Sequence, residues 1–147
     1  SRISGARFLD LYAGTGAVGL EALRQGVSEV VFVEADSNQS GKIKQLLEKR
    51  SAAQRACIIT KKASAFIKWA ELQNLTFDII FLDPPYHTEE IMHVLDEIGQ
   101  SQLPAQDGIV VAEHFKKKHL SDNLGKLQKN KDYKYGDTVL SVYKKFK

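Results

Sequence analysis

Short apolar runs alternate along the chain with stretches in which apolar residues recur every three or four positions. The runs are rich in β-branched and aromatic residues, as expected of buried strands. We expect these strands at residues 8–12, 29–33, 56–60, 77–82 and 108–112. The spacing i, i+3, i+4, i+7 between the runs is typical of helices with one buried face. It predicts helices at residues 17–25, 37–53, 63–70 and 91–98, with Ser37 as the cap of the second.

This alternation predicts a three-layer α/β fold of the Rossmann-like class, in which helices cover both faces of a mostly parallel sheet. The end of the chain breaks the pattern. Residues 124–133 and 138–143 flank Tyr135-Gly136-Asp137 and predict an antiparallel C-terminal hairpin. No repeat, linker or low-complexity stretch interrupts the chain, so we expect a single domain over residues 1–147.

The composition limits the classes of protein that remain open. An apolar content of 43% in 147 residues is enough for one core. No apolar window is long enough for a membrane helix, so we expect a soluble protein with no membrane partner. Cys57 is the single cysteine, which excludes an internal disulfide and favours a reducing, cytoplasmic compartment. Its apolar neighbours predict a small core residue.

Charge is unevenly distributed along the chain. Ten lysines and three aspartates follow Phe115, so this segment carries +7 and the preceding part −4 of a net charge of +3. A basic segment on an acidic body suits a surface that faces a polyanion, and solvated lysines are an equally good interpretation. Within the segment, Lys116 and Lys117 are candidate phosphate contacts. The histidines have no metal-ligand spacing, so we expect no metal.

A glycine loop follows the first strand. Gly14-Thr15-Gly16-Ala17-Val18-Gly19 matches G-x-G-x-x-G between a predicted strand and helix, where a ligand can approach the backbone closely. Glu34 ends the second strand and can accept hydrogen bonds from ribose hydroxyls. Such a loop could hold a pyrophosphate, but the carboxylate of Asp10 would repel one. The spacing therefore favours S-adenosylmethionine, which carries an ammonium and a sulfonium, without excluding a dinucleotide.

Asp83-Pro84-Pro85-Tyr86 follows the fourth strand, which we expect to lie beside the first. An exocyclic base nitrogen is a poor nucleophile because its lone pair is delocalised into the ring. The Asp83 carboxylate and the Pro84 carbonyl are acceptors that can localise this lone pair and orient the nitrogen. Tyr86 offers a face on which a flipped base can stack. The alternative is a plain Pro-Pro turn with Asp83 as a helix cap.

These motifs resemble the bacterial 16S ribosomal RNA guanine-N2 methyltransferase family of the RsmD type. The similarity is strongest over residues 8–23 and continues in Phe32-Val33-Glu34-Ala35-Asp36, in residues 81–86 and in Tyr135-Gly136-Asp137-Thr138. The DPPY tetrapeptide is shared with many amino methyltransferases, whereas the extended loop through Glu21-Ala22-Leu23 is more specific to this family.

The resemblance implies a seven-stranded methyltransferase sheet, S-adenosylmethionine as donor and a guanine amino group of 16S ribosomal RNA, within a small-subunit particle, as acceptor. The implied donor site comprises Asp10, Tyr12, Gly14, Gly16, Glu34, Ala35 and Ala63. The implied catalytic residues are Asp83, Pro84 and Tyr86, and the implied substrate contacts are Pro85 and Tyr86; the charge pattern adds Lys116 and Lys117 as substrate contacts. We expect a monomer.

Two features depart from the family pattern. Lys62 stands where relatives often carry an acid near the adenine ring. Relatives also begin with a basic segment that helps to bind RNA, which is missing before Ser1, so we expect a fragment or a leader that precedes this chain.

Three other functions remain open. A DNA adenine-N6 or cytosine-N4 methyltransferase would share the tetrapeptide, although no target-recognition insertion is visible. An NAD-binding oxidoreductase would explain the glycine loop and leave the tetrapeptide without a role. A non-catalytic RNA-binding or assembly module would need neither motif for chemistry.

Overall fold

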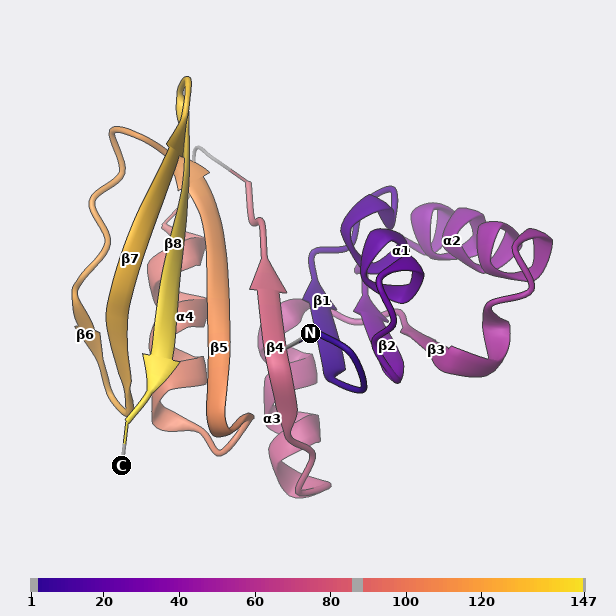
Figure 1. Cartoon of the computed structure of the whole chain (residues 1–147), viewed down its shortest axis with the longest axis horizontal. Coiled ribbons are helices and arrows are strands. Elements are labelled where there is room, and N and C mark those ends of the chain that lie inside the picture. The colour runs from indigo at the N-terminus through magenta and orange to yellow at the C-terminus, as the bar shows by residue number, and fades with distance from the viewer. Residues whose placement is uncertain (1–2, 86–88, 147) are drawn as a thin grey trace.

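The computed structural model describes residues 3–85 and 89–146, which form one twisted sheet flanked by helices (Figure 1). The strands lie in the order β3-β2-β1-β4-β5-β8-β7-β6. Pairing is parallel from β3 to β5 and antiparallel from β5 to β6. The bounds are β1 Arg7–Leu11, β2 Glu29–Val33, β3 Ala56–Ile59, β4 Phe77–Leu82, β5 Pro104–Phe115, β6 Asn123–Leu124, β7 Leu127–Tyr135 and β8 Thr138–Lys145.

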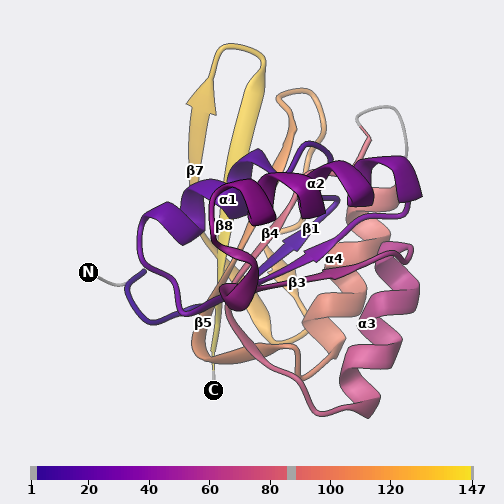
Figure 2. The same ribbon diagram turned by 90° about the vertical axis from the view of Figure 1, so that its right-hand side faces the viewer.

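Helices cover both faces of the parallel part of the sheet, as the alternation predicts (Figure 2). One core joins Phe8, Val30 and Phe32 to the first two helices, and the other joins Leu9 and Leu11 to the last two. The predicted three-layer α/β class is therefore confirmed. The helices are α1 Ala17–Arg24, α2 Ser37–Lys49, α3 Ala63–Leu72 and α4 Glu90–Gln100, with a 3-10 turn, η1, at Ala53–Arg55.

The inner strands are buried on both faces, which explains their unbroken apolar runs. Successive side chains of a strand point to opposite faces, so Phe8 faces α1 while Leu9 faces α3 and α4. Both side chains are buried, with 6% and 0% exposure. Burial of one such side chain stabilises the fold by roughly 1.5–3 kcal/mol. These paired contacts fix the carboxyl ends of β1, β2 and β4 next to one another.

The antiparallel part of the sheet is covered on one face. Side chains of β5 and β8 alternate between buried and half-exposed, with Val110, Ala112 and Tyr143 on the buried side. Among the described residues, α1 packs on β1 and β2, and α2 packs on β3. The same face of β5, β8 and β7 therefore has no helix above it within that part of the chain.

The hairpin differs from its prediction at its first strand. Residues 124–133 are not one strand, because β6 ends at Leu124 and Gly125 turns the chain with a positive φ of 57°. A Cβ at Gly99 would lie 2.2 Å from the Leu124 carbonyl oxygen, so this turn packs directly on the backbone of α4. The two-residue β6 also makes the sheet eight-stranded, whereas the resemblance implied seven.

Four local predictions were wrong. Asp36, not Ser37, caps α2, because its Oδ1 accepts hydrogen bonds from the N–H groups of Asn38 (2.8 Å) and Gln39 (3.3 Å); the helix also ends at Lys49, before η1. Cys57 is exposed, because β3 is the outermost strand at its side of the sheet. β5 begins at Pro104 rather than residue 108, with a shift in its register with β4 after Phe77.

No helix among the described residues is both long and apolar enough to cross a membrane.

Candidate active site

The glycine loop and the tetrapeptide leave neighbouring strands at the same edge of the sheet. β1 lies between β2 and β4, with Leu11 opposite both Val33 and Leu82. The connections from β1 and β4 go to helices on opposite faces of the sheet, so the two connections diverge at the ends of these strands. Ligands of open α/β sheets bind outside the carboxyl ends of the strands at such a point. The predicted adjacency of the first and fourth strands is therefore confirmed.

The glycines of the loop have distinct structural roles. Gly14 and Gly16 have φ values of 56° and 82°, in the region that favours glycine. Gly16 closes the turn by donating its N–H to the Ala13 carbonyl at 2.8 Å. Gly19 lets α1 approach β2, since a Cβ there would lie 2.3 Å from the Phe32 ring. The loop holds a tight strand-to-helix turn whose backbone a ligand can approach.

The Glu34 carboxylate is held by backbone N–H groups from the glycine loop and from the segment after β2. Its Oε1 accepts from the Gly14 N–H and its Oε2 from the Asp36 N–H, each at 2.8 Å. Each carboxylate oxygen keeps a further lone pair. Glu34 thus stands at the end of β2 in a set orientation, able to accept two more hydrogen bonds from a diol.

Asp10 lies beneath the loop. Its side chain has 1% exposure, and its Oδ2 accepts from the Gly19 N–H at 3.0 Å. Burial raises the pKa of Asp10 to about 7; the Gly19 hydrogen bond opposes this rise, and the carboxylates of Asp83 and Glu34 add to it. A cation above the loop would lower this pKa, because it would stabilise the charged form.

A pocket of about 470 Å³ opens beside the loop, a size common for small-molecule sites. Five residues expected in the site line it: Tyr12, Glu34, Ala35, Ala63 and Pro85. The remaining lining residues are Val33, Lys61, Lys62, Ser64, Glu90 and His93. Asp10, Gly14, Gly16, Asp83 and Pro84 are not in its wall; they lie on β1, in the glycine loop and directly after β4.

Tyr12, in the wall of this pocket, has a strained backbone. Its φ of 64° is uncommon for a residue with a large side chain, and such outliers cluster at functional sites. Its hydroxyl donates a hydrogen bond to Glu90 at the start of α4. Burial first, and then this hydrogen bond, raise the pKa of Tyr12 well above its usual range. The tyrosine therefore stays protonated and ties the end of β1 to α4.

The lysines of the pocket lie at the start of α3. Lys62 precedes α3 and lines the pocket, at the position where the family resemblance led us to expect an acid. Lys61 is its neighbour, and the Lys61 ammonium lies 5.6 Å from the centre of the Trp69 ring. The wall thus combines two lysines with Glu34 and Glu90 around the small apolar surfaces of Ala35 and Ala63.

Asp83 is half-buried and interacts with Glu113 on β5. Burial first, and then the charge and hydrogen bond of Glu113, raise the pKa of Asp83 to about 6. The structure thus places Glu113 against Asp83. Pro84 is buried and Pro85 is exposed at the pocket. Tyr86 lies outside the described residues, so its stacking role stays a prediction.

Sequence reasoning missed the contribution of α4 to the pocket. Glu90 and His93 reach it from the first turns of this helix, and His93 also pairs with Glu97 at 3.2 Å. Nothing in the local pattern signals this, because only the packing of α4 on β5 and α3 brings these side chains to β1. The predicted phosphate contacts Lys116 and Lys117 lie elsewhere, in the segment after β5.

Comparison with known sequences identifies the family. A family profile described as "Conserved hypothetical protein 95" matches residues 1–144. YlbH of Bacillus subtilis, whose name provisionally makes it an rRNA methyltransferase, is 33% identical over 141 residues, which cover 96% of this chain and 77% of that protein. Ribosomal RNA small subunit methyltransferase D of Haemophilus influenzae is 28% identical over 113 residues, or 76% of this chain and 58% of that protein. The chain thus spans only part of these relatives.

Solved structures agree with this assignment. A conserved hypothetical protein of Streptococcus pyogenes superposes with a TM-score of 0.88 at 29% identity, over 97% of this chain and 88% of that one. A protein of Haemophilus influenzae whose title provisionally makes it a methylase gives a TM-score of 0.88 at 25% identity, over 99% and 89%. The chain therefore belongs to the "Conserved hypothetical protein 95" family, the RsmD family that its motifs resemble.

Proposed function

We propose that this chain transfers a methyl group from S-adenosylmethionine to the exocyclic N2 of a guanine in 16S ribosomal RNA. One observation carries the proposal: the pocket that contains Glu34 and Tyr12 is also lined by Pro85 of the tetrapeptide. A donor in this pocket and a base held by Asp83 would share one cleft. The names of the relatives, which describe methyltransferases of ribosomal RNA, support the same reaction and the broader substrate class.

The residues of the site fit S-adenosylmethionine better than a dinucleotide. The free lone pairs of Glu34 can accept from both ribose hydroxyls. The raised pKa values of Asp10 and Asp83 reflect, after burial, repulsion among carboxylates at this edge of the sheet. A sulfonium and an ammonium would relieve that repulsion, whereas a pyrophosphate would increase it. Ala35 and Ala63 leave room for a flat ring, with Lys62 beside it.

Asp83 and the Pro84 carbonyl prepare the acceptor nitrogen. When they accept its two N–H bonds, the nitrogen pyramidalises and directs its lone pair toward the donor pocket. The donor supplies an electrophilic methyl carbon: the N–C bond forms as the C–S bond breaks, and the electron pair leaves with sulfur. The methylated amine is cationic and loses its proton readily, to the Asp83 carboxylate or to water. No stronger base is required.

Two measurements test this proposal in sequence. Calorimetry with S-adenosylhomocysteine should show binding, and NAD should give no heat. Methyl transfer from labelled donor to 16S ribosomal RNA, and to small subunits from cells that lack the enzyme, should yield N2-methylguanosine in nucleoside mass spectrometry. N6-methyladenosine or N4-methylcytidine as the product would replace the guanine assignment, and NAD binding alone would overturn the methyl-transfer assignment.

Asp83→Asn and Asp83→Ala make the catalytic test sharper. Both should lower kcat by about 10²- to 10³-fold, the usual cost of one lost stabilising group, and leave S-adenosylhomocysteine affinity unchanged. Glu71→Gln removes an exposed carboxylate of α3 outside the pocket and serves as the control. Full activity of Asp83→Ala would favour a non-catalytic RNA-binding role for the tetrapeptide.

A further inference from the structure

The hairpin of β7 and β8 extends beyond the body of the sheet at the edge where the candidate active site lies (Figure 1). Phe115, at the end of β5, is opposite Thr138 at the tip of this hairpin. Ala112 on the same strand is opposite Leu82, one residue before Asp83. Neighbouring strands are about 4.8 Å apart, so β7 passes the active-site edge at a lateral distance of about 15 Å from β4. We call residues 131–138 the arm.

The arm is exposed on both faces, which is unusual for a strand of nine residues. Every residue of β7 from Asn130 to Tyr135 is exposed, whereas β8 alternates between buried and half-exposed positions. Its outer edge is also open, because β6 pairs only with Leu127 and Gln128 within the described residues. Such a strand can contact another molecule through both of its faces and through the unpaired backbone groups of its edge.

The two faces of the arm differ in chemistry. Directly opposite residues of an antiparallel pair share a face, so Tyr133 lies with Leu140 and Lys134 with Val139. Tyr133 and Tyr135 therefore share the face that carries no helix, with 41% and 62% exposure. The Lys131 ammonium lies 4.8 Å from the centre of the Tyr133 ring on this same face. This face therefore presents two tyrosine rings and one lysine ammonium.

The opposite face borders a basic basin of about 450 Å³. The basin lies between β7 and the segment after β5 and has five lysines and two aspartates in its wall, Lys116, Lys117, Lys118, Lys129, Lys134, Asp122 and Asp132. The Lys118 ammonium pairs with Glu89, just before α4, so the basin wall is tied to the segment that follows the tetrapeptide.

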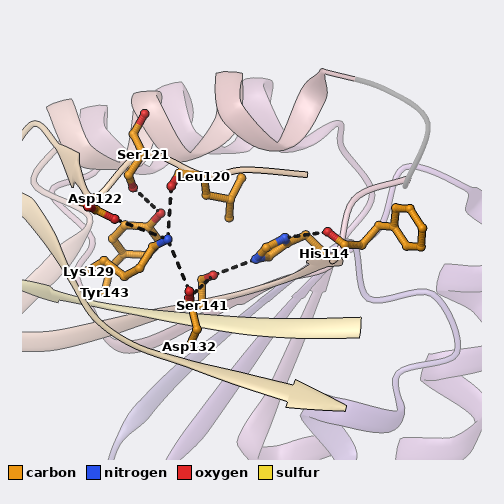
Figure 3. Close-up of polar contacts among 9 residues, drawn as sticks. His114, Leu120, Ser121, Asp122, Lys129, Asp132, Ser141 and Tyr143 are labelled. Atoms are coloured by element: carbon orange, nitrogen blue, oxygen red, sulfur yellow. Dashed lines mark hydrogen bonds and ion pairs between the residues drawn. The ribbon is translucent and has the colours of Figure 1, made fainter. Parts of the chain in front are cut away.

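Ion pairs and hydrogen bonds link the two aspartates of the basin to Lys129 and Ser141 (Figure 3). The Lys129 ammonium, with a side chain only 13% exposed, lies 3.6 Å from Asp122 and from Asp132. Ser141 donates a hydrogen bond to Asp132 at 2.6 Å, and the His114 ring lies 2.7 Å from the Ser141 oxygen. Both acids therefore pair with Lys129 rather than with Lys117 or Lys134.

The remaining cations are placed at the rim. Lys116 pairs with Asp137 at 3.0 Å, which joins the basin to the tip of the arm. Within residues 3–85 and 89–146, the side chains of Lys117 and Lys134 make no ion pair and no hydrogen bond. A cationic basin and a pair of exposed aromatic rings thus lie on opposite sides of one open strand edge.

We propose that the arm binds a single-stranded segment of the RNA substrate that flanks the target base. Phosphates contact Lys117 and Lys134 in the basin, and bases stack on Tyr133 and Tyr135 across the open edge of β7. Single-stranded nucleic acids are held by this combination of cations along the backbone and aromatic rings beneath the bases. The proposal rests on the proposed function for the nature of the substrate and assigns it a docking surface outside the methyl-transfer pocket.

Matched variants of the full chain test each face. Tyr135→Ala should raise KM for 16S ribosomal RNA by about tenfold, and Tyr135→Phe, which keeps the ring, should stay within about twofold of wild type. Lys117→Gln combined with Lys134→Gln should weaken RNA binding by about tenfold at low salt. It should also reduce the slope of log affinity against log salt by about 1.4, for two single-strand phosphate contacts.

The control pair is Lys42→Gln with Lys49→Gln on the exposed side of α2, which removes the same charge far from the arm. All variants should keep wild-type kcat and affinity for S-adenosylhomocysteine. An unchanged KM and salt slope in the arm variants, with an active wild type, would overturn the docking surface. Arm-dependent RNA binding by a wild type that methylates no guanine would overturn the proposed function alone.

A crosslinking experiment separates RNA from protein as the partner. The photoreactive substitution Tyr135→p-benzoylphenylalanine should crosslink to ribosomal RNA when the variant is mixed with small subunits from cells that lack the enzyme. The same substitution at the exposed position Leu72 on α3 should give no specific RNA crosslink. Crosslinks from position 135 to a ribosomal protein alone would overturn the RNA assignment in favour of a protein contact.

Discussion

The two halves of the sheet follow different rules of burial. In the parallel half, β1 and β2 are buried on both faces apart from their first residues. In the antiparallel half, β5 and β8 are buried on one face only, and most of β7 is exposed on both. The parallel half, which we call the closed half, can hold a small molecule at the ends of its strands, where the backbone is rigid. The antiparallel half, which we call the open half, offers exposed surface area, and a macromolecule needs a large contact surface more than a rigid pocket.

The largest expected effect contrasts one buried and one half-exposed residue. Phe32→Ala removes a ring with 0% exposure between α1 and α2 and should lower the free energy of unfolding by about 3–5 kcal/mol. Val142→Ala on the open face of β8 should cost less than about 1 kcal/mol. Urea denaturation of both variants measures the difference. Equal losses would mean that the open face is covered in solution.

The next effect concerns the close contact between α1 and β2. Gly19→Ala places a methyl group 2.3 Å from the Phe32 ring and should destabilise the fold by about 1–3 kcal/mol. Gly41→Ala, in α2 with open space around it, should instead stabilise by roughly 0.5–1 kcal/mol. In a double-mutant cycle, Phe32→Leu should recover part of the Gly19→Ala loss. Strictly additive losses would refute the steric explanation.

A third prediction links the two halves through Asp83 and Glu113. Because the pKa of Asp83 is raised to about 6, its carboxylate is present above that pH and is protonated below it. Methyl transfer should therefore fall as pH drops through 6. Glu113→Gln removes a charge that raises this pKa, so the midpoint of the pH–rate profile should move to lower pH, with a several-fold gain in relative rate at pH 5. A midpoint that moves upward would contradict this coupling.

The smallest expected effect is at the arm. Tyr133→Ala should change the free energy of unfolding by less than about 0.5 kcal/mol, because this ring lies outside both cores, with 41% exposure. Thermal and urea denaturation should place the variant beside wild type even though RNA binding weakens. A loss of 2 kcal/mol or more would assign Tyr133 a structural role instead.

The closed half is predictable from sequence because its signals are local. Continuous apolar runs identify β1, β2 and β4, and the spacing of Ala63, Phe66, Ile67 and Ala70 identifies the buried face of α3. Gly14 and Gly16 shape their own loop, and Glu34 stands at the end of its own strand. Their positions follow from the order of elements alone, since parallel strands with helical crossovers bring these ends together.

Other features depend on contacts between distant segments. Glu90 and His93 enter the pocket through the packing of a whole helix. Glu113 reaches Asp83 through the register of β5 with β4. The exposure of Cys57 depends on β3 having no further neighbour among the described strands, and an apolar sequence such as Ala56–Ile59 cannot distinguish an edge from a centre.

The exposed position of Cys57 also makes the protein easy to follow in solution. It is the one cysteine of the chain and lies on the edge strand opposite the arm, six strand spacings or about 30 Å from β7. Desolvation by its neighbours, and then the Glu29 carboxylate, raise the pKa of its thiol, so less of the reactive thiolate is present at neutral pH. Mildly alkaline conditions should therefore allow a single fluorophore to be attached at a site remote from the arm.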